Sequence, residues 1–142
     1  MERIKVTANF KSVVGSDLMQ TVYVEETKPS SETWEQFDAR IWQRKVHTDT
    51  TTGQVFIPPF ALKNAFEVAG KWLNEKIQGE GKKTYTDRFR KGVLVLDRMM
   101  LTHKGKPVTI ADAVPNTIMA PVTGRRGDGA RVPRVFPTIG EG

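Results

Sequence analysis

Three glycine-containing stretches of the sequence gather basic side chains in a way that suits phosphate binding. Arginine forks and lysine ammonium groups contact phosphate oxygens, and glycines let backbone amides approach a ligand closely. The first stretch also contains Tyr85 and Phe89, whose rings can stack on unpaired bases. The alternative is that these are solvated loops whose charge only keeps the chain soluble. The basic residues are Lys82, Lys83, Arg88, Arg90 and Lys91 in the first stretch, Lys104 and Lys106 in the second, and Arg125, Arg126, Arg131 and Arg134 in the third.

A further cation, Lys63, lies in the first turn of a helix that the sequence predicts to begin at Pro59 or Phe60. The N-terminal end of a helix carries partial positive charge and prefers anions. A lysine at this position is therefore either a mild electrostatic cost or half of an anion site. The candidate contacts to nucleic acid are Lys63, Lys82, Lys83, Tyr85, Arg88, Arg90, Arg125, Arg126 and Arg131.

Residues suited to catalysis are scarce in this sequence. It has no cysteine, and its two histidines, His47 and His103, are far apart and have no clear acidic or nucleophilic partner. Asp38 is the one candidate, since an aspartate can take part in metal-assisted phosphodiester cleavage. The alternative, which we adopt, is that Asp38 is an isolated surface aspartate. The sequence thus predicts a protein that is not an enzyme and uses no cofactor or metal.

Length and charge indicate one basic domain. A chain of 142 residues is most often a single domain, here residues 1–142, with its own hydrophobic core. A net charge of +6 favours a polyanionic partner such as nucleic acid. No apolar run approaches the roughly 20 residues of a membrane span, and the N-terminus lacks the apolar region of a signal peptide. We therefore expect a cytoplasmic protein without a membrane partner.

Strand patterns surround one helix pattern, which predicts the α+β class. Residues 3–10 alternate apolar with basic or polar side chains, a period of two that is typical of a strand. The long helix is expected from residue 59 or 60 to about 77. Further strands are expected over 18–24, 54–57 and 93–101, with a helical turn and another strand within 109–122. Between them we expect a loop rich in basic residues over 79–92 and a basic hairpin tip over 102–108. An exposed excursion is expected over about 25–51, in which 37–46 is a strand or short ribbon.

The helix pattern places its apolar residues on one stripe, which indicates packing against a core. Pro58 and Pro59 suit the start of the helix, and Gly79 suits its end. The residues of the stripe are Leu62, Ala65, Phe66, Ala69, Trp72, Leu73 and Ile77.

The segment "QVFIPPFALKNAF" follows Thr52-Gly53, and it keeps Ile57, Pro58, Leu62, Lys63 and Phe66 of a longer motif. That motif, I-P-x-[ST]-[ST]-L-K-G-x-[LF]-R after a Thr-Gly turn and a short strand, resembles the one common in the RAMP superfamily of CRISPR-associated proteins. The sequence departs from it at Phe60-Ala61, Asn64 and Glu67. The similarity covers about the first 75 residues. It is greatest to the backbone subunits that line guide RNA and to small phage-encoded proteins that look like single copies of them.

The resemblance implies a ferredoxin-like, RNA-recognition-type core with an inserted thumb-like hairpin, which would correspond to the excursion. It also implies that Lys63 and the helix dipole face the guide-RNA backbone. In RNA-cleaving relatives an aspartate on a loop before the motif acts on target RNA, and Asp38 lies in the comparable region. Family members close with a further helix, strand and glycine-rich loop, for which no room follows Arg131. We therefore expect a C-terminally incomplete core whose edge strand a partner chain could pair.

These observations predict a non-enzymatic protein that binds single-stranded nucleic acid, either RNA or DNA, with RNA favoured by the resemblance. A second possibility is a protein-interaction module, such as a phage protein that occupies or imitates a CRISPR complex surface. The acidic stretch from Glu25 to Glu35, with Trp34 and Trp42, is the evidence for it, since aromatic rings anchor partners. Self-association is a related expectation, because backbone-type relatives form filaments. A third possibility is a metal-dependent ribonuclease that uses Asp38.

Overall fold

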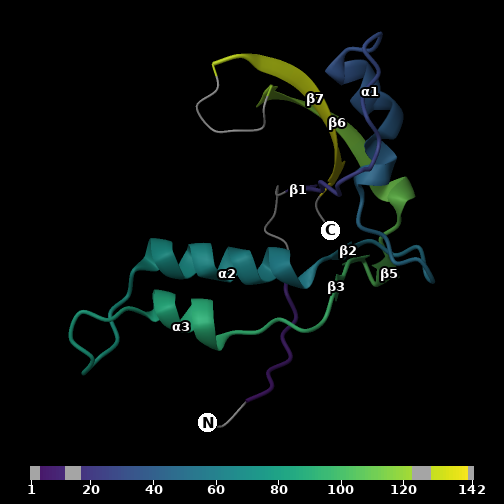
Figure 1. The fold of residues 1–142 in the computed structure, drawn as a ribbon. Coiled ribbons are helices and arrows are strands. Elements are labelled where there is room, and N and C mark those ends of the chain that lie inside the picture. The colour runs from purple at the N-terminus through teal and green to yellow at the C-terminus, as the bar shows by residue number, and fades with distance from the viewer. Residues whose placement is uncertain (1–3, 12–16, 123–128, 141–142) are drawn as a thin grey trace. The chain divides into compact units, whose positions relative to one another are not determined.

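The computed structural model describes residues 4–11, 17–122 and 129–140 (Figure 1). This part of the chain is a mixed α+β structure with three α-helices and antiparallel sheets, which confirms the predicted class. It divides into two compact units: unit 1 comprises Met1–Val46 and Thr102–Gly142, and unit 2 comprises His47–Leu101. The ferredoxin-like core stays a prediction.

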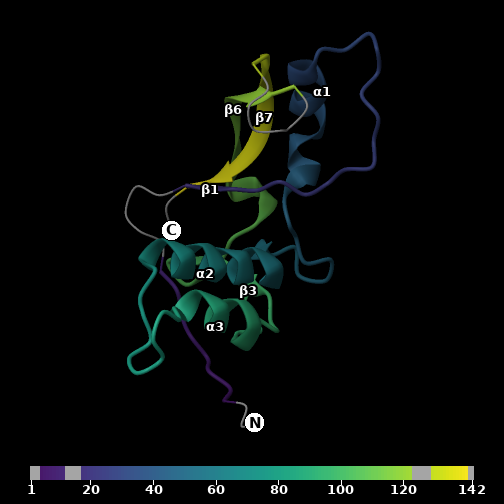
Figure 2. The same cartoon turned by 60° about the vertical axis from the view of Figure 1, so that its left-hand side comes forward.

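Unit 1 is built on a long antiparallel hairpin with a helix packed against it. Its last two strands pair over nine residues each, and the short first strand pairs with the end of the last one, in the order β1-β7-β6. Figure 2 shows α1 beside this hairpin, and α1 contacts β7. The elements are β1 (Leu18–Met19), α1 (Trp34–Ile41), the 3-10 helix η1 (Trp42–Lys45), β4 (Thr102–His103), β5 (Lys106–Pro107), the 3-10 helix η2 (Ile110–Asp112), β6 (Ala113–Pro121) and β7 (Arg131–Ile139).

The stretch 37–46 is helical, so the prediction of a strand or ribbon there was wrong. A capping box starts α1: the Thr33 hydroxyl accepts a hydrogen bond from the Gln36 amide at 3.2 Å, and the Gln36 side chain accepts one from the Thr33 amide at 2.9 Å. Phe37 and Ile41, four residues apart, are both buried. The signal for a helix was thus present in the sequence as Thr-x-x-Gln before an apolar pair.

The predicted N-terminal strand does not form. Residues 4–11 pair with no strand in the described part of the chain, and Ile4 and Val6 are about four-fifths exposed at 82% and 78%. An alternating pattern needs a neighbouring strand to complete its hydrogen bonds. The core of unit 1 instead uses Phe37, Ile41, Val46, Val108, Ala113, Val135 and Ile139.

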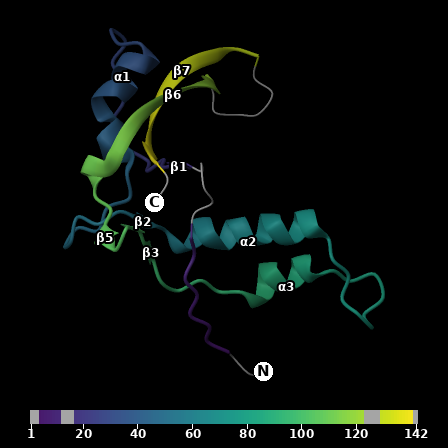
Figure 3. The same ribbon diagram turned by 180° about the vertical axis from the view of Figure 1, so that it is seen from behind.

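Unit 2 is a pair of helices with a short strand pair, β2 against β3. α2 and α3 run side by side, joined at one end by a loop, as Figures 1 and 3 show. The prediction of a long helix starting at Pro59 is confirmed, although it ends at Leu73 with Asn74 in the left-handed region. The elements are β2 (Phe56–Ile57), α2 (Pro59–Leu73), α3 (Tyr85–Gly92) and β3 (Met99–Met100).

Residues 85–92 form α3, where the sequence suggested only a loop, and Gly70 explains how it packs. The Phe89 ring lies so close to Gly70 that a Cβ there would be 2.9 Å from Phe89 Cδ2. The rings of Phe66 and Phe89 also stack, with centroids 6.4 Å apart. The helices can approach because glycine has no side chain. The helix–helix contact therefore lies along Phe66 and Gly70 of α2.

The expectation that the whole apolar stripe of α2 packs in a core was wrong. Leu62 and Phe66 are half-buried, but Trp72 is 84% exposed and Leu73 is 67% exposed. Ala65 and Ala69 are exposed as well. One side of the stripe faces α3, and the other side faces outward.

The helices of the described chain include none whose length and apolar composition would let it cross a membrane.

Candidate nucleic-acid interface

Lys63 is held by groups of its own unit. Its ammonium donates hydrogen bonds to the backbone carbonyls of Phe89 and, at 2.9 Å, of Arg90, and it lies 3.2 Å from the Glu67 carboxylate. Phe89 and Arg90 are in the last turn of α3, whose C-terminal carbonyls carry partial negative charge. Lys63, the fifth residue of α2, thus neutralises the C-terminal end of α3. Its three acceptors leave it poorly placed to hold an added phosphate.

Replacing Lys63 by methionine should destabilise unit 2 and leave nucleic-acid binding nearly unchanged. The substitution keeps the apolar stem but removes the charge from the helix end, which costs about 1–2 kcal/mol at a partly buried position. Urea unfolding and a salt titration of binding measure the two effects. Lys71→Met, an exposed lysine of the same helix, is the control. A flatter salt dependence with unchanged stability would instead support a phosphate contact by Lys63.

The loop between α2 and α3, residues 74–84, is here named the basic loop. It folds back on itself: Lys76 and Thr84 form an antiparallel bridge, and the Ile77 amide donates to the Lys83 carbonyl at 2.9 Å. Gly79 and Gly81 have φ of 81° and 65°, a region that glycine adopts without strain. The tight turn therefore places the lysines on either side of it close to one another.

The cations of the basic loop are largely free. Lys76 and Lys82 are exposed and have no ion pair within the described chain. The Lys83 side chain is 75% exposed and lies 3.4 Å from Glu80, which Arg88 also contacts. Unit 2 contains nine lysines and arginines against six aspartates and glutamates. Of this excess of three positive charges, the basic loop contributes one, because Glu75 and Glu80 oppose its three lysines, and α3 contributes the other two.

Two aromatic rings lie at the same end of the helix pair as the basic loop. Tyr85, the first residue of α3, is 41% exposed, and Trp72, in the last turn of α2, is 84% exposed. Exposed rings beside cations can stack on bases. The sequence pattern had predicted that Trp72 is buried in the core. Gly70 marks the side of α2 that packs on α3, and at 100° per residue Trp72 lies about 160° around the helix from it. This angle is a signal in the sequence that Trp72 faces outward.

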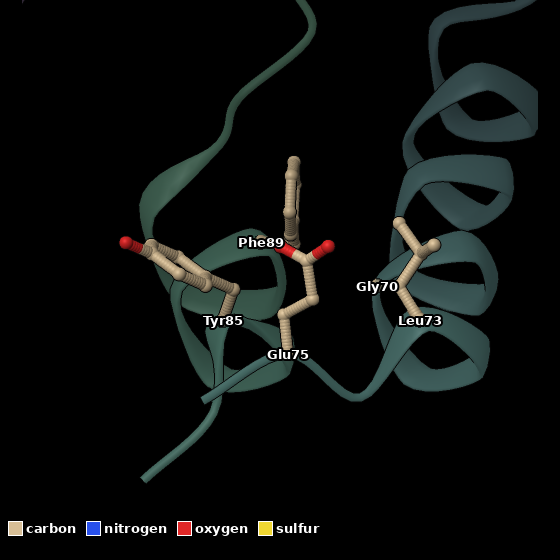
Figure 4. A pocket seen from close by; sticks show the side chains of 5 residues that line it. All are labelled: Gly70, Leu73, Glu75, Tyr85 and Phe89. Carbon is tan, nitrogen blue, oxygen red and sulfur yellow. The ribbon is translucent and has the colours of Figure 1, made fainter. Parts of the chain in front are cut away.

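A pocket of about 230 Å³ adjoins the basic loop, and Figure 4 shows it from close by. Its lining combines apolar and aromatic groups with one carboxylate. The lining residues are Gly70, Leu73, Glu75, Tyr85 and Phe89.

The remaining predicted contacts are dispersed. Arg90 has an exposed side chain on α3. Arg131 is exposed at the start of β7, in unit 1, and its guanidinium is 3.5 Å from the Met119 carbonyl. Arg125 and Arg126 lie outside the described residues. The structure thus brings together Lys82, Lys83, Tyr85 and Arg88 in unit 2.

Asp38 is fully buried, so the expectation of a surface aspartate was wrong. Its carboxylate accepts hydrogen bonds from Lys45 Nζ at 2.5 Å, Arg134 Nε at 2.5 Å and the Val135 amide at 3.2 Å. Lys45 also lies over the ring of Phe136, 4.8 Å from its centroid. These bonds connect α1, η1 and β7. Asp38 therefore has a structural role, and its oxygens are occupied.

This carboxylate should make unit 1 sensitive to acid. Burial alone would raise the pKa of Asp38, but hydrogen bonds from Arg134 and Lys45 outweigh it and hold that pKa below its ordinary value. A carboxyl group with a lowered pKa stabilises the fold above its unfolded pKa, about 3.9, and this contribution is lost as pH falls through the lowered value. Urea midpoints should drop below about pH 4. A midpoint independent of pH over that range would contradict the interpretation.

Glu26 and Asp112 have lowered pKa values in the same unit, so a variant is needed to isolate Asp38. The difference in stability between the wild-type protein and Asp38→Asn should shrink as the pH falls, because both carry a neutral group at that position in acid. Glu35→Gln, on an exposed residue of α1, should keep the wild-type profile.

The acidic stretch before α1 is bound to arginines of its own unit. Arg40 contacts Glu26 at 2.6 Å and Glu32 at 3.3 Å, and Arg44 also contacts Glu26. Trp34 lies under the Arg134 guanidinium, 4.4 Å from its ring centroid. These contacts give the stretch partners within unit 1, which partly neutralise its charge and place a cation over the Trp34 ring.

Comparisons of this chain with protein-family models, with curated proteins and with solved structures give no match. The resemblance to the RAMP superfamily therefore stays a prediction based on the motif around Ile57 and Lys63.

Proposed function

We propose that this protein binds single-stranded nucleic acid through the basic loop and the neighbouring rings of Tyr85 and Trp72. RNA is favoured over DNA by the resemblance of the motif. The observation that supports this most directly is a set of unpaired or weakly paired lysines, Lys76, Lys82 and Lys83. They lie at the end of the helix pair that also carries the exposed rings of Tyr85 and Trp72. Free lysines can contact backbone phosphates, and exposed aromatic rings can stack on unpaired bases.

Binding of this kind should tolerate many sequences and depend steeply on salt. Each phosphate contact to a single strand adds roughly 0.7 to the slope of log affinity against log salt concentration. A fluorescence-anisotropy titration with single-stranded RNA and single-stranded DNA measures this slope and the preference between them. An affinity that does not change with salt would contradict the proposal, because a phosphate-binding surface must release counterions.

A second candidate function, binding of a protein partner, is favoured by the exposed face of α2. Val68 is 54% exposed and Trp72 is 84% exposed, and exposed tryptophan often anchors protein interfaces. Freshly purified protein distinguishes the two functions. High absorbance at 260 nm relative to 280 nm before any high-salt wash indicates bound nucleic acid. A stoichiometric protein partner in the mass spectrum indicates an interaction module.

We do not extend the proposal to RNA cleavage by Asp38. A carboxylate that acts on an external phosphodiester, directly or through a metal, needs free oxygens that the substrate or metal can reach. The Asp38 oxygens are buried and accept hydrogen bonds from Lys45, Arg134 and Val135.

A further inference from the structure

The pocket beside the basic loop is too small for a whole nucleotide or a drug-sized ligand. Such ligands occupy cavities of roughly 300–1,000 Å³, whereas this pocket has about 230 Å³. The aromatic rings of Tyr85 and Phe89 and the side chain of Leu73 form part of its lining (Figure 4). A lining of this kind and size suits one planar ring system that stacks on an aromatic side chain.

The walls of the pocket are held by contacts of α3 with α2 and with the start of the basic loop. The Tyr85 amide donates to the Glu75 carbonyl at 3.0 Å, and the Thr86 hydroxyl donates to the Gly70 carbonyl at 3.0 Å. Phe89 packs directly on Gly70. All of these contacts join groups of the protein itself. Walls held by the protein's own packing lower the entropic cost of binding.

Glu75 gives the pocket its only carboxylate among the lining residues. In Figure 4 this carboxylate lies between Tyr85 and Leu73. It has no hydrogen bond or ion pair with any residue in the described ranges, although its sequence neighbour Lys76 is also unpaired. An ionised carboxylate only accepts hydrogen bonds. Glu75 is exposed, and no donor among the described residues occupies its oxygens. The pocket thus presents accessible acceptors beside ring-stacking surfaces.

Guanine is the base whose hydrogen-bonding edge best matches a free carboxylate. Unstacked bases in single strands are read along their Watson–Crick edges. On guanine this edge places the N1–H and N2–H donors side by side, so both carboxylate oxygens can accept from one base. Adenine and cytosine place an acceptor nitrogen next to the amine, and uracil places carbonyls on both sides of its single N–H. Only guanine therefore allows a bidentate, charge-assisted pair.

We propose that this pocket receives one unstacked base of a bound strand and selects guanine through Glu75, an inference that rests on nucleic-acid binding by the basic loop. The base stacks on Tyr85, and the Glu75 carboxylate accepts hydrogen bonds from its N1–H and N2–H groups. Lysines of the same loop, Lys76 and Lys82, supply cations for the adjoining phosphates.

Anisotropy titrations with two oligomers test the selection: oligouridylate, and the same oligomer with one central guanosine. The wild-type protein should bind the guanosine oligomer about ten-fold more tightly, as expected for one bidentate pair. Glu75→Gln should lose most of this preference, yet bind oligouridylate at least as well, because a negative charge has been removed. Asp87→Asn removes the same charge from an exposed position of α3 and should keep the preference.

Three outcomes decide between the inference and the function on which it rests. If wild type binds both oligomers equally, with steep salt dependence, the selection of guanine is wrong and nucleic-acid binding stands. If neither oligomer binds at low salt, both are wrong. If Glu75→Gln and Asp87→Asn change the preference equally, the effect is one of net charge, and the pocket does not read the base.

A carboxylate among aromatic rings would also suit the cationic side chain of a protein partner. An NMR titration of the whole chain distinguishes this ligand from a nucleic-acid base. Guanosine monophosphate should shift the amide resonances of Gly70, Leu73 and Tyr85 more than uridine monophosphate does. Shifts caused by arginine amide and not by guanosine monophosphate would overturn the proposal and assign the pocket to a partner's arginine.

Discussion

Asp38→Asn should destabilise unit 1 by about 3–5 kcal/mol, the usual cost of removing one member of a buried ion pair. The substitution keeps the shape of the side chain but removes the anion between two cations. Lys45, whose side chain is 8% exposed, would then be buried opposite a neutral amide. Arg134 would lose its carboxylate partner in the same step. Because the carboxylate connects α1 and η1 to β7, we expect all three elements to be affected.

Urea unfolding followed by circular dichroism measures this effect, with Glu35→Gln as the matched control. Glu35 lies on α1, three residues before Asp38, and is exposed with no ion pair in the described chain. Both substitutions remove one negative charge and replace an acid by its amide. An Asp38→Asn variant as stable as Glu35→Gln would show that the buried charges are not coupled to folding.

The double variant Lys82→Ala, Lys83→Ala should make the slope of log affinity against log salt concentration shallower by about 1.4, or roughly 0.7 for each phosphate contact removed. The affinity for a single strand at low salt should also fall, because counterion release drives such binding. Both lysines are exposed, and neither supports a helix end as Lys63 does. Stability should therefore remain near that of the wild-type protein, since surface substitutions away from such features change it little.

Lys104→Ala, Lys106→Ala is the matched control for this loss of charge. It also removes two exposed lysines from a turn, the β4–β5 hairpin of unit 1. If both double variants flatten the slope equally, binding follows net charge alone and is not localised at the basic loop. A slope unchanged in the Lys82, Lys83 variant would remove the basic loop from the proposed interface.

Local sequence signals predicted the parts of the fold that depend on neighbouring residues. The pair Pro58-Pro59 and the stripe of Leu62 and Phe66 indicated α2 and its start. The stretch 102–108 indicated the β4–β5 hairpin, in which Lys104 and Gly105 adopt positive φ. The capping box at Thr33 was equally legible, as Thr33 and Gln36 three residues apart before the apolar residues Phe37 and Ile41.

The candidate site was predicted only in part, because local patterns do not say which side of a helix is covered. The sequence indicated the cations and Tyr85 of the stretch 79–92. It did not show that Trp72 is exposed, since its spacing fits the same stripe as Phe66. Gly70 decides this: α3 approaches where the side chain is absent, so the opposite side of α2 stays open.

By itself, the sequence determined the positive charge, the absence of cysteine, the α+β class and the residues able to contact phosphates or bases. The tertiary structure alone decided the roles of Lys63 and Asp38. Lys63 neutralises the end of α3, a helix that begins 22 residues later in the chain. Asp38 binds an arginine from the last strand, β7. Charge is a property of a residue, but whether that charge is available depends on partners that folding brings from distant positions.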